Sequence, residues 1–292
     1  MRRRLFGLLV CMLILLIPVV FGLNVFGRSM SNDEYVDAPV WSIGDSWTYD
    51  VEFDQRFDQN NRFHWFIDDM CFTVTEDTGS VYKLDFVGNI TGDIEHFPFS
   101  KHLKGGTIEG YEMVEKTNLG LLEIVAHIDG VSSFHHWSSE VPVVVDVRVT
   151  FDPVFALLNF PFFVGKNWIY NSSTVTIDYT ISTFGMPESM HKVIFIEAGP
   201  VSCAGKEVVS VEAGVYEAFE VDVQEGLLEI YYAPEVANVV RVSGMGPARF
   251  TSVDMELVST TYTPLGAPGK PSQPEGPTSG SAGEVYTYCA ST

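Results

Sequence analysis

Apolar and polar side chains alternate along most of the chain from about residue 39 onward. Residues 174–182 place apolar side chains on one face and polar groups on the other, and residues 143–151 do the same. A period of two is typical of antiparallel strands that have one face toward water. The pattern predicts further strands at 47–53, 62–75, 81–90, 107–114, 121–128, 192–197, 207–211, 216–223, 227–232, 239–242 and 254–262.

Helical signals are scarce in the same region, because no long segment has a capped period of 3.6 residues. One short helix is predicted at 152–159, with Asp152 as the N-cap and Pro153 at the first helical position. Ala213 and Gly214 lie between two predicted strands and indicate a hairpin turn.

A short motif occurs twice: an apolar residue, Gly, two polar residues, then Trp-x-Tyr. Gly can adopt a positive φ and turn the chain tightly, and residues two apart on a strand face the same side. Each copy therefore predicts a turn leading into a strand that places two rings in a core. The two copies are carried by Gly44, Trp47 and Tyr49, and by Gly165, Trp168 and Tyr170.

The repeat predicts two related β-rich halves, at about 39–151 and 152–264. The fold class expected is all-β, with one or two large antiparallel sheets that form a curved half-barrel or a sandwich after an N-terminal hydrophobic helix. About a dozen strands in one sheet tend to curl or to split into layers. The pattern leaves open whether the halves form one domain or two.

The N-terminus has the features of an export signal. Arg2, Arg3 and Arg4 precede an apolar run that extends to about Phe26. Residues 1–30 are therefore interpreted as a cleaved signal peptide or as a retained signal anchor in the membrane. Either alternative places residues 31–264 outside the cell or on its surface.

Charge excludes one class of partner. The formal net charge is −21, with 17 Lys and Arg against 38 Asp and Glu. A nucleic-acid partner is not expected, because phosphate binding needs a basic surface. The acidic excess indicates a solvated external surface, and no Asp-x-Asp-x-Asp-Gly loop supports the alternative of a cation-binding face.

Cysteines and sequons fit export. Cys71 and Cys203 lie in different halves, so they are either a candidate disulfide or two buried free thiols. Asn89 and Asn171 are candidate glycosylation sites, since each begins an Asn-x-Ser/Thr triplet.

No motif predicts catalysis. His135 and His136 are adjacent and would face opposite sides of a strand, which disfavours a shared metal. No Gly-x-Ser-x-Gly elbow, phosphate-binding loop or zinc spacing occurs, so no cofactor is expected. Trp65 and Trp137, each next to a histidine, are the tryptophans predicted to be exposed or to line a cavity.

The C-terminal region changes composition. Residues 265–283 are rich in Pro, Gly and Ser and predict a linker. The stretch from Pro271, with Gly283-Glu-Val-Tyr-Thr-Tyr288, resembles the opening of PKD-type immunoglobulin-like domains, which are common on archaeal and bacterial surface proteins. The resemblance implies that residues 284–292 are a truncated first strand.

The main region has a second resemblance. The Gly-x-x-Trp-x-Tyr motif, the segment 211–221 and the segment 231–240 with Tyr232-Ala-Pro234 resemble a group of exported domains that is similar to Lol-type half-barrel lipoprotein carriers. That group usually has Gly where this chain has Ala237. The resemblance implies an antiparallel sheet around an apolar cavity, without catalytic residues.

Three functional hypotheses follow. The first is a non-enzymatic surface protein with a binding or scaffolding role toward another surface protein. The alternative is a carrier of a lipid or other apolar ligand in a half-barrel cavity. An extracellular hydrolase is the third.

Overall fold

The computed structural model describes residues 35–58, 61–96, 99–134, 137–161, 163–183, 185–245 and 251–263. The predicted signal segment, the linker at 265–283 and the strand at 284–292 lie outside these residues. Within the described ranges, no helix has the length and hydropathy needed to cross a bilayer. The described residues up to Tyr262 belong to one compact unit, which includes the predicted half 39–151 and the predicted half 152–264 as far as residue 262.

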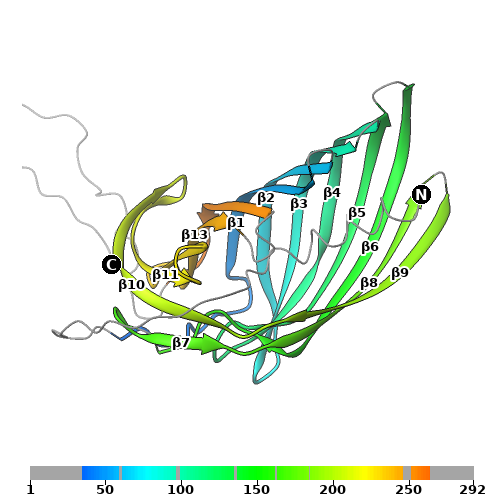
Figure 1. Ribbon diagram of the computed structural model, residues 1–292. Coiled ribbons are helices and arrows are strands. Elements are labelled where there is room, and N and C mark those ends of the chain that lie inside the picture. The colour runs from blue at the N-terminus through cyan, green and yellow to red at the C-terminus, as the bar shows by residue number, and fades with distance from the viewer. Residues whose placement is uncertain are drawn as a thin grey trace, which may run out of the picture. The chain divides into compact units, whose positions relative to one another are not determined.

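The described residues are all-β, as the alternating pattern predicted (Figure 1). The strands are β1 (Ser46–Asp58), β2 (Asn61–Asp77), β3 (Val81–His96), β4 (Phe99–Glu115), β5 (Leu121–Phe134), β6 (Trp137–Phe155), β7 (Asn167–Tyr170), β8 (Ser173–Thr183), β9 (Met186–Ile196), β10 (Gly199–Val211), β11 (Gly214–Val223), β12 (Leu228–Ala233), β13 (Asn238–Met245) and β14 (Thr251–Thr260).

All fourteen strands belong to one antiparallel sheet, in the order β7-β10-β11-β12-β13-β14-β1-β2-β3-β4-β5-β6-β8-β9. The sheet is strongly curved but is not closed into a barrel (Figure 1). Of the alternatives that the sequence left open, the structure has the curved single sheet. The first and last strands of the described chain meet in its middle, where β1 pairs with β14.

Strands β7 to β10 form one long bent hairpin. Tyr170 pairs with Gly199 in β7 and β10, and Ser173 pairs with Ile196 in β8 and β9, so both pairs share one register. Beyond the bend β10 pairs with β11, whereas β9 pairs only with β8 among the described strands. The sheet therefore stays open along the outer edge of β9.

The two copies of the repeated motif have the same backbone geometry. Gly44 and Gly165 both have positive φ, at 99° and 91°. The Gly44 amide donates to the Val74 carbonyl and the Gly165 amide donates to the Cys203 carbonyl, each at 2.8 Å. The residue after each glycine accepts a bond back from the same partner, at 2.9 Å in both copies. The predicted turn is confirmed, and β1 with β2 corresponds to β7 with β10.

The predicted helix at 152–159 is wrong. Strand β6 continues to Phe155, and Asp152 pairs with Thr174 of β8. Asp152 is the last residue of the ladder with β8 and Phe155 pairs with Leu121 of β5, so the start of this segment hydrogen-bonds in the sheet and the local helix signals are overridden. The hairpin near Gly214 is confirmed, since Val211 pairs with Gly214.

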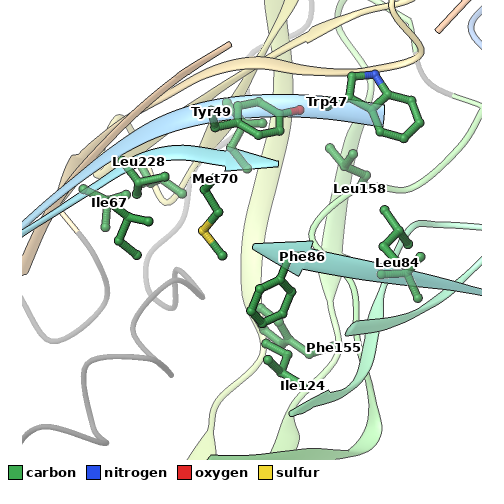
Figure 2. Packing of buried hydrophobic residues seen from close by; sticks show 14 of the residues in the cluster. Trp47, Tyr49, Ile67, Met70, Leu84, Phe86, Ile124, Phe155, Leu158 and Leu228 are labelled. Carbon is green, nitrogen blue, oxygen red and sulfur yellow. The ribbon is translucent and has the colours of Figure 1, made fainter. Parts of the chain in front are cut away.

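The core lies on the concave face of the sheet, where the apolar positions of successive strands point. Figure 2 shows part of this cluster. Indole and phenol donors from β1 and the segment before it fix one part of this cluster to the backbone of residues 236–239, where the chain passes from β12 into β13. Trp47 Nε1 donates to the Val236 carbonyl at 2.8 Å, Trp41 Nε1 to that of Ala237 at 2.9 Å, and Tyr49 Oη to that of Val239 at 2.9 Å. These bonds hold the β12–β13 turn against β1.

Candidate functional site

One charged side chain occupies a position of the apolar inner row. Glu112 of β4 shares its face with Ile108 and Val114, which are both buried. Leu84 of β3 is its partner in register on one side and Ile124 of β5 on the other. Both neighbours are at most 6% exposed, so the carboxyl group is enclosed laterally by aliphatic side chains.

The apolar row continues on both sides of Glu112. Val149 of β6 follows Ile124 in register, and Ile177 of β8 follows Val149, with both fully buried. On the other side Val74 of β2 follows Leu84 and is also fully buried. Figure 2 shows Leu84, Phe86, Ile124 and Phe155 in the cluster around this row.

The electrostatics of Glu112 follow from these neighbours. Burial raises the pKa of Glu112 from 4.5 to about 7, because an apolar environment disfavours the charged form. Burial also raises the pKa of Tyr49 well above its usual value, and the nearby Glu112 and Tyr232 raise it further. Tyr49 and Glu112 thus project toward the same part of the concave space.

No hydrogen bond or ion pair joins Glu112 to another described residue, but its carboxyl oxygens are not among the buried side-chain atoms that lack a partner, so the group keeps some contact with solvent. A carboxyl group in apolar surroundings normally has a partner, so an unpaired one is a candidate functional group. It can accept or donate a hydrogen bond when protonated and can pair with a cation when ionised.

Trp65 provides an unsatisfied polar group on the same face. Its ring lies on the backbone of Gly92 in β3, where an added Cβ would approach the indole to 2.6 Å. Trp65 is 6% exposed, and its buried Nε1 has no hydrogen-bond partner. Of the two roles predicted for Trp65, the exposed one is therefore excluded. The side chain of Trp137 lies outside the described residues.

The histidines whose side chains are described lie on the outer face, each beside a carboxylate of the neighbouring strand. The distances are 2.6 Å for His64 and Glu52, 2.6 Å for His102 and Asp93, 2.7 Å for His127 and Asp146, and 2.8 Å for His191 and Asp178. His135 and His136 lie outside the described residues. No group of three or more metal-ligating side chains occurs within the described ranges.

The candidate disulfide is not formed, because Cys71 and Cys203 are both free. Cys71 lines a shallow hollow of about 470 Å³ on the outer face, together with Asp85, Tyr111 and His127. Cys203 is fully buried on the inner face of β10. The two thiols therefore face opposite sides of the sheet, which a sequence pattern could not show.

The aromatic residues of the repeated motif and the two sequon asparagines differ in burial. Trp47, Tyr49, Trp168 and Tyr170 are all buried, as the repeat predicted. The candidate glycosylation sites Asn89 and Asn171 are exposed, and glycosylation itself remains a prediction.

Sequence reasoning missed Glu112. In the segment 107–114 the apolar residues Tyr111 and Met113 alternate with Ile108 and Val114, so both faces of the predicted strand look partly apolar. Only the pairing with Leu84 and Ile124 identifies which face is the inner one. A charged residue in phase with Ile108 and Val114 was the available signal.

No protein-family model, curated protein or solved structure matches this chain.

Proposed function

We propose that this protein is a non-enzymatic binding protein that holds a lipid or another apolar ligand against the concave face of its sheet. The observation that carries the proposal is the composition of that face: apolar residues of successive strands form a continuous surface, and the indole donor of Trp65 on it has no partner. Ligand sites for apolar molecules have this composition, with few polar groups that fix orientation. The buried indole donor of Trp65 is such a group, and Glu112 is a further polar side chain among apolar neighbours on the same face.

Export to the cell surface, with attachment through the N-terminal segment, is part of the same proposal. It is supported by the arrangement of Arg2–Arg4 before an apolar run and by the net charge of −21. A lipid ligand would be available at that location.

The experiment is native mass spectrometry of the full chain, produced with its own export segment in a host with membranes. We expect an additional mass that is lost on denaturation and that proves to be a lipid after extraction. A bare polypeptide mass, together with no uptake of added lipids by the purified chain, would contradict the proposal.

A second function, binding or scaffolding through another protein, is favoured by the free edge of β9. Val193 and Phe195 of this strand are 56% and 63% exposed on its outer face. An exposed apolar edge strand is a template for pairing with a strand of another chain.

Replacing Val193 and Phe195 by Lys tests this second function. The double variant should lose self-association or partner capture measured by light scattering after size exclusion. The matched control is Val87→Lys, because Val87 is 52% exposed on the central strand β3, where both edges are paired. Equal behaviour of the two variants would refute a role of the β9 edge.

A further inference from the structure

We propose that the free edge of β9 pairs with the same edge of a second copy of this chain, antiparallel and about a two-fold axis at Met190. The inference rests on the second proposed function, binding through this edge, and specifies the partner. β9 lies at one end of the curved sheet and pairs only with β8 among the described strands (Figure 1). It offers eleven residues for pairing, whereas β7 at the other end of the sheet has four.

The order of side chains along β9 is complementary to itself when the strand is reversed. With Met190 opposite Met190 of the second copy, each residue before it faces the residue equally far after it in the other chain. The resulting pairs are Ser189 with His191, Glu188 with Lys192, Pro187 with Val193 and Met186 with Ile194. Apolar residues therefore face apolar residues, polar residues face polar residues, and each acid faces a base.

Charge is the most specific part of this match. Glu188 and Lys192 lie on the inner side of β9, since Ile181 and Ile177, their register partners in β8, are buried there. The two-fold pairing forms two Glu–Lys pairs, one on each side of the axis. Opposite charges directly across an antiparallel pair stabilise it, and like charges destabilise it. An ammonium has three donors, so Lys192 can keep its existing interaction when it meets Glu188 of the second copy.

The apolar residues of β9 contribute burial. Met186 is 67% exposed and Val193 is 56% exposed. A strand added at about 4.8 Å would place an apolar side chain beside each of them. Burial of apolar surface is the main favourable term in most protein association. Pro187 has no amide to donate, but it lies near the end of the matched segment, where a proline is tolerated.

The two-fold arrangement limits the assembly to two chains. Such a contact uses the same surface on both partners, so each β9 edge is occupied once the pair has formed. Pairing of β9 with β7 of the next copy would instead continue from chain to chain. The four residues of β7 do not match the length of β9, which favours the closed pair.

Disulfide cross-linking tests the register. Met190→Cys should give a covalent dimer under mild oxidation, because each Met190 faces its copy. The matched control is Ile194→Cys on the same face of β9, since the two Ile194 residues would be about 27 Å apart. A mixture of Ile194→Cys and Met186→Cys chains should cross-link. The unchanged chain controls for cross-links through its own cysteines.

Exchange of the charges tests the Glu–Lys pairs. The full chain in a mild detergent should have twice the mass of one chain by light scattering after size exclusion. Glu188→Lys and Lys192→Glu should each weaken the dimer by about tenfold, because like charges then face each other at two places. The chain that carries both substitutions should recover the affinity of the unchanged chain.

Three results would overturn the inference: a monomer at every concentration measured, a series of higher oligomers, or equal cross-linking of Met190→Cys and Ile194→Cys. The double Val193 and Phe195 variant described above then decides separately about the second proposed function. If that variant loses capture of another protein, the β9 edge binds a different partner and the second function stands. If it behaves like the Val87→Lys control, both fail.

Discussion

Glu112 is a single acidic residue placed where a strand pattern normally puts an aliphatic one, and its effect on stability is determined by protonation. The pKa of its carboxyl rises from 4.5 to about 7 on folding, so the folded state holds the proton more tightly than the unfolded state. The stabilisation is complete below pH 4.5 and is lost as the pH rises through 7.

We therefore expect Glu112→Gln to stabilise the protein above pH 7 and to have little effect below pH 4.5. A shift of this size corresponds to about 3 kcal/mol at most. Urea unfolding of both chains at pH 4.5 and 8 would measure it, with Glu109→Gln as the control. A difference that is the same at both pH values would show that the charge of Glu112 is not the cause.

Cys71 and Cys203, the cysteines among the described residues, should differ in reactivity. Cys71 is partly exposed in the outer hollow, whereas Cys203 is fully buried and its pKa is raised to about 12, mainly by burial. Since the thiolate is the reactive form, iodoacetamide should modify Cys71 in the folded chain and Cys203 only after unfolding.

Peptide mass spectrometry after labelling would assign the modified thiol, with the unfolded chain as the reference for full labelling. Protection of both residues, relieved together by a reducing agent, would contradict the free thiols of the structure. Whether Cys71 and Cys203 form a disulfide could not be decided from the sequence, because separation along the chain does not indicate which face of a sheet a cysteine occupies.

At the scale of elements, alternation predicted the strands well because each strand has one face toward an apolar core. The helix at 152–159 failed for a complementary reason. Asp152 and Pro153 carry local helix-start signals, but Asp152 pairs with Thr174 of another strand. A local sequence signal does not indicate such a partner. Order and register of the strands depend on such partners, so the curved single sheet was only one of the predicted alternatives.

The repeated turn gives a test at this scale. Gly44 and Gly165 have positive φ and no atom within 4 Å of an added Cβ, so only backbone strain opposes a side chain there. We expect Gly44→Ala and Gly165→Ala each to destabilise the protein by about 1–2 kcal/mol. Thermal unfolding would measure this.

Gly105 of β4 is the matched control for the turn, because it also has open space but no positive φ. Gly105→Ala should be close to neutral. If all three variants behave alike, the turn conformation is not what the motif requires glycine for.

At the scale of the whole molecule, the pairing of β14 with β1 joins the last described strand to the first. Leu257 is fully buried and Val253 is 6% exposed on the inner face of β14. A chain that ends at Met245 lacks this strand and leaves edges of β1 and β13 unpaired. We expect it to lose cooperative thermal unfolding, measured by circular dichroism.

A chain that ends at Thr263 is the control, since it keeps the whole compact unit. It should unfold at the same temperature as the full chain. Cooperative unfolding of the shorter chain would show that β14 contributes little.

The position of β1 also has a consequence during synthesis on the ribosome. Ser46 to Asp58 emerge early and can pair at once with β2, but their other edge waits for Thr251 to Thr260. Until nearly the whole unit has been translated, β1 presents an unpaired edge that can join with other chains. We therefore expect a chaperone that binds extended apolar segments to associate with the growing chain until Thr251 to Thr260 have been made.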